Sequence, residues 1–207
     1  MRDRFTDDDE GMLLSKHAIQ RIIDHVPKRR QMRAGYIPSA ILMLFFNRDN
    51  RTHLVYIRKT SGPNLHSGQM AFPGGKIDPE DGSSRHAAAR ETLEEIGVPE
   101  SCYDYVGEMG FFETLTSRYD AAAHVGWAAT PPTYQRSKFE VERIIEIPVG
   151  GLYEQLRPHL DFDDYQELVT LNFKFKPSDA SEVVNLWGLT ARITHHFLQG
   201  LHEIYDM

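Results

Sequence analysis

Three glutamates, Glu91, Glu94 and Glu95, have the spacing that places their carboxylates on one face of a helix. Residues at positions i, i+3 and i+4 are neighbours on a helix surface, where like charges repel one another. A cation must therefore offset the repulsion. Arg90 is one candidate, and Mg²⁺ or Mn²⁺ is a better one, because these ions prefer carboxylate oxygens. A solvated acidic helix face without a metal is the simpler alternative.

The segment from Phe72 to Val98, FPGGKIDPEDGSSRHAAARETLEEIGV, contains the signals needed to build that helix. Ser83 or Ser84 is a good N-cap, and the three alanines that follow favour helix strongly. Gly97, followed closely by a proline, is a typical stop signal. The Pro-Gly-Gly sequence before the helix predicts a turn.

The same segment resembles the Nudix box, whose pattern is G-x5-E-x7-R-E-U-x-E-E-x-G-U with U aliphatic. The matching residues are Gly75, Arg90, Glu91, Glu94, Glu95, Gly97 and Val98. Three features depart from the pattern. Asp81 stands in place of the first glutamate, one extra residue lies between Asp81 and Arg90, and Thr92 replaces an aliphatic residue. The extra residue is expected to lengthen the loop before the helix and to leave the helix face intact.

The resemblance implies hydrolysis of a phosphoanhydride with the help of metal ions. Metal ions offset phosphate charge and acidify water, and two of them about 4 Å apart can hold both the nucleophile and the bridging phosphate oxygens. We expect Glu91 and Glu95 to be metal ligands, and Glu94 to be a third ligand or the base that activates water. The Gly75 carbonyl, freed by the turn, can add another oxygen, and Arg90 is expected to orient the carboxylates.

A second resemblance lies upstream of the box, where the sequence is similar to the coenzyme A pyrophosphatase subgroup of Nudix enzymes. Arg58, Gly68 and the Phe72–Gly75 motif fit that signature, whereas Asn64 stands where the subgroup has an arginine. The resemblance implies that coenzyme A or an acyl derivative is cleaved to 3′,5′-ADP and the corresponding 4′-phosphopantetheine.

Two other functions stay open. One is a Nudix hydrolase of ADP-ribose, a dinucleoside polyphosphate or a damaged nucleotide, and the other is a nucleotide-sensing module without catalysis. The intact R-E-x-x-E-E sequence argues against the module, because a sensor has no need of three carboxylates. We assign substrate contacts to Arg58, Gly74 and Arg118.

Further charged residues lie outside the box. Nudix proteins often hold another acidic residue near the metals, and Glu140 and Glu142 are candidates for it and for the general base, although surface carboxylates are the simpler interpretation. A basic cluster near Arg29 is either a solvated loop or a contact to substrate phosphate.

Composition narrows the class of protein. The 207 residues are 41% hydrophobic and 26% charged, which is typical of a soluble globular chain. The net charge of −7 argues against a general nucleic-acid binder. No apolar run reaches membrane length and no signal peptide is apparent, so we expect a cytoplasmic protein without membrane partners. The single cysteine, Cys102, excludes an intramolecular disulfide and is expected to be at least partly buried. A homodimer stays open.

The remaining patterns predict a mixed α/β (α+β) fold, and the Nudix resemblance makes it an α/β/α sandwich with the box helix on one face of a central sheet and the C-terminal helix on the other. Residues 1–11 are expected to be a loose end, and residues 12–207 a single domain with helices near both termini. Predicted helices cover 13–26, 150–159 and 186–205, and predicted strands cover 39–46, 52–58, 70–72, 103–112, 121–129 and 166–175.

Overall fold

The computed structural model describes residues 12–60, 68–160, 172–175 and 183–205 of the chain. Its helices are α1 (Lys16–His25), α2 (Ser84–Ile96), α3 (Val149–Leu156) and α5 (Gly188–Tyr205), with short 3-10 turns at Pro79–Asp81, Glu100–Cys102 and Arg157–His159. Its strands are β1 (Ile37–Arg48), β2 (Arg51–Lys59), β3 (Met70–Ala71), β4 (Gly74–Lys76), β5 (Asp104–Glu113), β6 (Tyr119–Ala128), β7 (Val141–Pro148), β8 (Asn172–Phe175) and β9 (Val184–Trp187).

Seven of the described strands form one mixed sheet, with β1 at its centre. Strand β1 pairs in parallel with β6 and antiparallel with β2 and β4. The remaining pairs, β2 with β7, β2 with β3 and β5 with β6, are antiparallel. Strands β8 and β9 form a separate antiparallel hairpin. The predicted mixed α+β fold is therefore confirmed.

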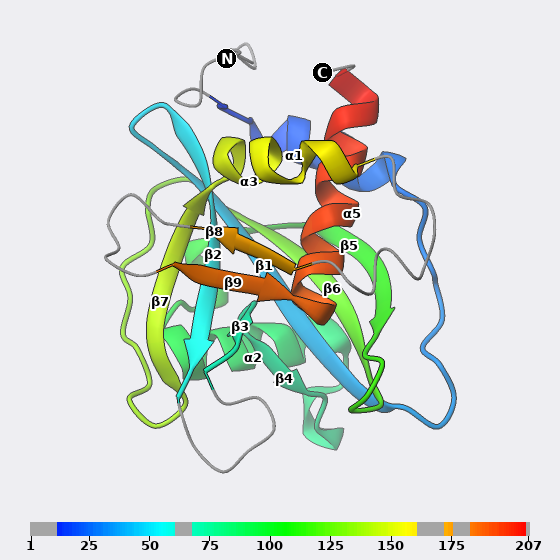
Figure 1. Ribbon diagram of the computed structural model, residues 1–207. Coiled ribbons are helices and arrows are strands. Elements are labelled where there is room, and N and C mark those ends of the chain that lie inside the picture. The colour runs from blue at the N-terminus through cyan, green and yellow to red at the C-terminus, as the bar shows by residue number, and fades with distance from the viewer. Residues whose placement is uncertain (1–11, 61–67, 161–171, 176–182, 206–207) are drawn as a thin grey trace.

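Side chains along β1 alternate between two buried clusters, one on each face of the sheet, as the two-residue period of a strand requires. Leu42 and Leu44 pack in the cluster that contains the buried alanines of α2. Met43 and Phe45 pack in the cluster that contains residues of α1, α3 and α5. Helix α2 thus covers one face and the other three helices cover the opposite face (Figure 1). This is the layered arrangement predicted from the sequence.

The sheet divides into two branches on one side of β1. Along one edge, β1 pairs with β6 from Ile37 to Phe46. Along the other edge it pairs with β4 through residues 39–41 and with β2 through residues 45–48. Strand β2 therefore leaves β1 after the hairpin and continues with β3 and β7. We call the gap between the β4 branch and the β2 branch the fork.

Two predicted helix boundaries were wrong at their N-terminal ends. Helix α1 begins at Lys16, because the Ser15 hydroxyl accepts a hydrogen bond from the Ala18 amide and caps the helix there. Leu14 lies before the helix but is fully buried. Helix α5 begins at Gly188, whose φ of +60° separates it from β9. Leu186 is thus a buried strand residue and not the first residue of the helix core.

The other predicted elements match the observed ones to within a few residues, whereas β7 and β9 had not been predicted as strands. The turn predicted at 47–51 contracts to Asp49 and Asn50, which both have positive φ, as a two-residue hairpin requires. The register of β5 shifts at Gly107, where a bulge was predicted. Strand β8 covers the end of the strand predicted at 166–175, and residues 166–171 lie outside the described residues.

The structure also bears on the predictions about Cys102 and about membrane-spanning segments. Cys102 is exposed at the end of a 3-10 turn in which no residue is buried, contrary to the burial we expected. Within the described residues, we find no helix that is both long enough and apolar enough to cross a bilayer.

The buried His124 connects the sheet to the start of α2. Its burial leads us to predict that the free energy of unfolding depends on pH. The His124 ring lies 3.1 Å from the Tyr105 hydroxyl and 3.0 Å from the Ser84 hydroxyl, and only 2% of the residue is exposed. Burial lowers the pKa of His124 to about 4, with Arg85 adding to the effect. Below pH 6.5 the unfolded chain therefore takes up a proton that the folded chain does not, and stability falls.

This single group should cost about 2 kcal/mol of unfolding free energy between pH 7.5 and pH 5, measured by urea unfolding. His124→Gln, which keeps hydrogen-bonding capacity but does not titrate, should lose that part of the pH dependence. An identical pH slope in the variant and the wild type would show that His124 does not carry it.

Candidate active site

Helix α2 presents the acidic face and is capped as the sequence predicts. The Ser83 hydroxyl accepts a hydrogen bond of 3.2 Å from the His86 amide, and Gly97 ends the helix in a left-handed conformation. The buried face of the helix packs through Ala87, Ala88 and Ile96 against the sheet. Its other side carries the three glutamates at the level of β4.

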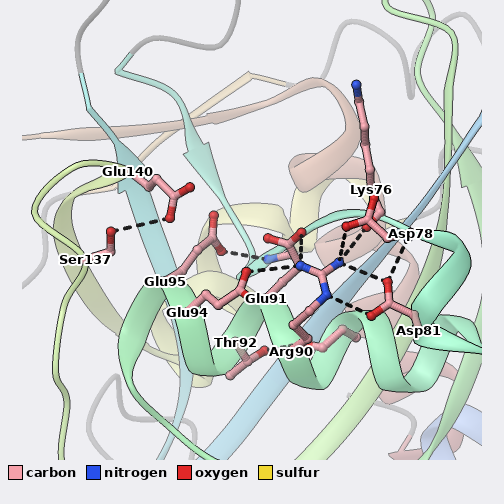
Figure 2. A network of polar contacts seen from close by, with 12 residues as sticks. Lys76, Asp78, Asp81, Arg90, Glu91, Thr92, Glu94, Glu95, Ser137 and Glu140 are labelled. Atoms are coloured by element: carbon pink, nitrogen blue, oxygen red, sulfur yellow. Dashed lines mark hydrogen bonds and ion pairs between the residues drawn. The ribbon is translucent and has the colours of Figure 1, made fainter.

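Arg90 lies at the centre of a network of carboxylates (Figure 2). Its guanidinium donates two hydrogen bonds, of 2.8 and 3.0 Å, to Asp81, and others of 2.9 Å to Glu91 and 3.1 Å to Glu94. A further bond of 3.1 Å reaches the Lys76 carbonyl. The Arg90 guanidinium lowers the pKa of Asp81, whose side chain is almost fully buried. The arginine thus joins α2 to β4 and to the preceding 3-10 turn.

Glu95 lies in the fork. One carboxylate oxygen accepts a hydrogen bond of 2.8 Å from the Gly74 amide, and the other lies 3.4 Å from the Lys59 ammonium at the end of β2. Burial raises the pKa of Glu95 to about 7, although Lys59 and the Gly74 amide both favour the charged form. The site therefore holds a buried carboxylate whose charge its protein neighbours only partly offset.

Glu91 packs against β4. An ideal Cβ atom on Gly75 would lie less than 3.0 Å from the Glu91 carboxylate, so the absence of a side chain makes room for it. Burial raises the pKa of Glu91, with Arg90 opposing the shift. The predicted turn at Gly74 and Gly75 was wrong, because both residues belong to a strand that pairs with β1. The Gly75 carbonyl therefore lies in a paired strand and is not freed by a turn.

The two later acidic candidates differ in their surroundings. Glu142 in β7 accepts a hydrogen bond of 2.9 Å from Arg58. Glu140 precedes β7, and in Figure 2 its side chain is turned toward the α2 carboxylates. The segment before it is tied to α2, because the Ser137 amide donates to the Glu95 carbonyl. Of the two, Glu140 is therefore the better placed to join the acidic site.

The donor chemistry of this site fits a divalent cation, because the available ligands are carboxylate and carbonyl oxygens. The buried, incompletely neutralised carboxylates of Glu91 and Glu95 also fit. In the arrangement seen here, however, the described part of the chain has no three His, Cys, Asp or Glu side chains that converge on one point. Figure 2 shows the Arg90 guanidinium bonded to Glu91 and Glu94. Glu95 instead accepts a hydrogen bond from the Gly74 amide, so the three carboxylates do not converge.

A cavity of about 470 Å³ lies next to the two glycines of β4, and Gly74 and Gly75 line it. The other residues predicted to contact substrate, Arg58 and Arg118, do not line this cavity. Arg58 pairs with Glu142, and Arg118 is an exposed loop residue with a φ of +55°.

The basic cluster before β1 has a structural partner. Arg29 donates two hydrogen bonds to Asp120, a fully buried carboxylate in β6. The Asp120 hydrogen bonds raise the pKa of Arg29, so the arginine stays charged. This arginine therefore fixes its loop to the sheet.

Sequence reasoning missed one residue of the site and left the role of another open. Lys59 reaches Glu95 only because of how β2 and α2 are packed, and nothing in its local sequence signals the contact. Asp81 was recognised in place of the first glutamate of the pattern, and the structure shows that its carboxylate binds Arg90.

Comparisons with known proteins agree with this geometry. The NUDIX domain family model matches residues 36–144, which is more than half of the chain. The protein named Uncharacterized Nudix hydrolase NudL from Yersinia enterocolitica is 32% identical over 157 residues, covering 76% of this chain and 77% of the relative. The Probable nudix hydrolase C6G9.05 of Schizosaccharomyces pombe is 24% identical over 163 residues, and the match spans only 55% of its length.

The fold agrees as well. The crystal structure of the MutT protein from Methanosarcina mazei Go1 superimposes with a TM-score of 0.51 at 18% identity, covering 84% of this chain and 99% of the other. The predicted resemblance to the Nudix family is therefore confirmed by sequence and by fold. The chain belongs to the Nudix hydrolase family, whose members are pyrophosphohydrolases that generally use divalent metal ions.

Proposed function

We propose that this protein hydrolyses the diphosphate of a nucleoside diphosphate linked to another moiety, with Mg²⁺ or Mn²⁺ as cofactor. The observation that carries the proposal is the position of Glu95. It is a buried acidic side chain in the fork, bonded to Gly74, which itself lines the cavity. An acidic cluster and a ligand-sized cavity thus share one short strand, β4.

Each residue of the site has a role in this proposal. Glu91 and Glu95 hold the metal, and the Gly75 carbonyl, although it lies in the paired strand β4, offers its second lone pair as a further ligand. Glu94 is the most exposed of the three glutamates, so it can exchange protons with solvent and serve as a third ligand or as the base. Arg90 holds Glu91 in place and is itself fixed by Asp81.

When bound, a divalent metal ion supplies Lewis acidity that offsets phosphate charge and acidifies water. Side chains of the protein supply the positive charge that attracts the diphosphate and the base that receives a proton. Lys59 and Lys76 line the cavity beside β4 and are placed to attract the diphosphate. Glu140, which accepts a hydrogen bond of 3.4 Å from the Ser137 hydroxyl and is turned toward the α2 carboxylates in Figure 2, is the candidate for a second base.

We propose coenzyme A or an acyl derivative as the substrate, with 3′,5′-ADP and 4′-phosphopantetheine, or its acyl form, as products. The support is the similarity of Arg58, Gly68 and the Phe72–Gly75 motif to the coenzyme A subgroup. Asn64, the departure from that signature, lies outside the described residues. ADP-ribose and dinucleoside polyphosphates are the competing substrates.

Removal of metal should abolish activity. In EDTA, hydrolysis of every diphosphate substrate should fall to background, and added Mg²⁺ or Mn²⁺ should restore it, as measured by product chromatography. The reason is that the phosphate charge has no other sufficient counter-charge at the acidic face. Full activity in metal-free buffer would refute the metal-dependent mechanism.

A panel of coenzyme A, acetyl-coenzyme A, ADP-ribose and diadenosine tetraphosphate, compared by kcat/KM, tests the substrate. A coenzyme A compound should rank first. If ADP-ribose leads by about tenfold, equivalent to about 1.4 kcal/mol in transition-state binding, the coenzyme A assignment is wrong. If no compound is hydrolysed with metal present, the sensing module becomes the better description.

A further inference from the structure

The cavity beside β4 extends across four strands of the sheet, on the face opposite to α2. Lys76 of β4 pairs with Ser39 of β1, and Ser39 pairs in turn with Ala121 of β6. Ala121 pairs with Phe112 of β5, so β4 and β5 are three strand spacings, about 14 Å, apart. Ser39 faces the same side as Ile41, which packs with the cluster that contains α5. The small side chains of Ser39 and Ala121 line the cavity and leave the space above them open.

The charged side chains of the cavity all have the same sign. Its described lining includes the cations Lys59, Lys76 and Arg192, and no aspartate or glutamate. Lys59 and Lys76 lie at the β4 end, and Figure 2 shows the Lys76 side chain extended away from α2. Gln69 lies at this end too, because its carbonyl accepts a hydrogen bond of 3.0 Å from the Lys59 amide. In a chain with a net charge of −7, such a lining favours an anionic ligand.

Arg192 lies at the other end of the cavity, beside the end of β5. It extends from α5, and only 9% of the residue is exposed. Its guanidinium donates a hydrogen bond to the Glu113 carbonyl, and a carbonyl acceptor fixes a guanidinium without neutralising its charge. Within the described residues, the buried Nε atom of Arg192 has no hydrogen-bond acceptor. A fixed positive charge therefore borders the cavity far from the two lysines.

The loop next to Arg192 is held by its own hydrogen bonds. The Thr114 hydroxyl donates to the Tyr119 carbonyl and accepts from the Tyr119 amide, and the Ser117 hydroxyl donates to Thr114. Thr116 of the same loop lines the cavity and is exposed, and the described residues supply no partner for its hydroxyl. A loop that is already ordered loses little conformational entropy when it receives a ligand. Thr116 can thus add a second donor beside the guanidinium.

We propose that the end of the cavity formed by Arg192 and Thr116 is a subsite for a phosphomonoester that the substrate carries on the ribose of its nucleotide. The inference rests on the proposed function, in which Lys59 and Lys76 attract the diphosphate at the β4 end. A second phosphate on the same nucleotide then reaches Arg192, whose planar guanidinium suits phosphate oxygens. Apolar side chains of the lining, such as Phe72, leave room for the nucleoside between the two anionic groups.

Arg192 thereby determines which substrates are preferred. Coenzyme A carries a phosphomonoester on the 3′-carbon of its ribose, whereas ADP-ribose and diadenosine tetraphosphate have none. The charge and position of Arg192 distinguish these classes without reference to the upstream motif on which the coenzyme A proposal rests. A substrate without the extra phosphate would leave the guanidinium without an anion to bind.

Two ligands that differ only in this phosphate test the subsite directly. Adenosine 3′,5′-bisphosphate and adenosine 5′-monophosphate should be titrated by calorimetry in EDTA, so that neither metal nor turnover contributes. We expect the bisphosphate to bind about 10- to 100-fold more tightly, because hydrogen bonds to charged groups are strong. Equal affinities would overturn the inference. Inorganic phosphate that binds as tightly as the bisphosphate would assign the subsite to a free anion and would also overturn it.

Variants assign the preference to named residues. Arg192→Gln should bind the monophosphate as the wild type does and lose the preference for the bisphosphate. Arg192→Lys keeps the charge but not the planar donors, so it should keep part of the preference. Thr116→Val replaces an exposed side chain, should fold normally and should lower the preference several-fold. A full preference in Arg192→Gln, or in both Arg192→Lys and Thr116→Val if that variant does not fold, would refute the assignment.

Arg136→Gln is the matched control. Arg136 also donates to a backbone carbonyl, that of Val141, but it does not line the cavity. The substitution removes the same charge from the chain, and the variant should keep the full preference for the bisphosphate. If Arg136→Gln lowers the preference as much as Arg192→Gln does, net charge explains the effect and the subsite is refuted.

Activity then separates this inference from the proposed function. With metal present, kcat/KM for coenzyme A should exceed that for dephospho-coenzyme A, which lacks the 3′-phosphate, by at least about tenfold, and Arg192→Gln should abolish most of this difference. Metal-dependent hydrolysis that ignores the 3′-phosphate would refute the inference and leave the function standing. Tighter binding of the bisphosphate without hydrolysis of any diphosphate would do the reverse.

Discussion

Glu95→Gln is expected to lower kcat by about 10²-fold or more without lowering the stability of the fold. The carboxylate is buried and its pKa is raised to about 7, so its charge is costly to the folded state. Glutamine has the same shape, and its carbonyl oxygen can still accept the Gly74 amide. In the absence of metal, the variant should therefore melt at or above the wild-type temperature. Catalysis should suffer because an anionic ligand has been lost.

Glu91→Gln and Glu94→Gln extend the experiment to the whole helix face. Each relieves repulsion between like charges worth a few tenths of a kcal/mol per pair, and each should cost about 10²-fold in kcat. Glu91→Gln and Glu95→Gln should also raise the metal concentration needed for half-maximal rate. Thermal melts in EDTA and initial rates over a metal titration measure both effects.

Glu80→Gln is the control, because Glu80 is a nearby carboxylate outside the R-E-x-x-E-E core, and the variant should stay within a few-fold of wild-type activity. If the three variants stay active and melt much lower than wild type, the carboxylates serve to hold the helix through ion pairs. That result would favour the solvated acidic helix over the metal site.

Gly75→Ala and Gly74→Ala should fail in different ways although the residues are adjacent. A methyl group on Gly75 would meet the end of the Glu91 side chain, which can move aside. We therefore expect a folded protein that has lost about 10- to 100-fold in kcat, because Glu91 no longer holds its position.

A methyl group on Gly74 would meet the backbone of β1, which cannot move, and φ at this residue is +151°. Gly74→Ala should lose on the order of 3 kcal/mol of unfolding free energy.

Gly82→Ala separates strain from crowding. Gly82 also has a positive φ, of +69°, but nothing lies within 4 Å of an added Cβ atom, so only about 1 kcal/mol should be lost. Urea unfolding and steady-state kinetics on all three variants are sufficient. If Gly74→Ala costs no more than Gly82→Ala, the close approach to β1 is not what fixes the strand. Full activity in Gly75→Ala would mean that the position of Glu91 matters little.

The local features of the site could be predicted because short-range physics controls them. Helix α2 is set by its capping serine, its alanines and Gly97, and the spacing of three glutamates decides which side chains share a face. The near-continuous apolar run at residues 39–46 indicates a strand that is buried on both faces, which is why β1 could be placed in the middle of the sheet. These signals lie within a few residues of the structure they determine.

The contacts that complete the site could not be predicted, since they join distant segments. The ion pair of Lys59 with Glu95 and the bond from Gly74 to Glu95 depend on how the sheet divides, which no local pattern reveals. The misplaced turn at Gly74 and Gly75 has the same origin. Glycines favour turns in isolation, but Gly74 and Gly75 belong to a strand here. Residues 39–41 of β1 are not paired with β2, and β4 pairs with them instead.

The division of the sheet also creates strand edges that could cause self-association if they were left uncovered. Where β2 separates from β1, each strand is left with an edge of unpaired amides and carbonyls, the kind of edge that recruits a strand from another chain. Residues 70–76 cover both edges, because β3 pairs with β2 and β4 pairs with β1. The bend at Pro73 between these two short strands lets one segment do both. Damage to this segment should therefore lead to self-association as well as to loss of catalysis, so the segment protects solubility and holds the acidic site at once.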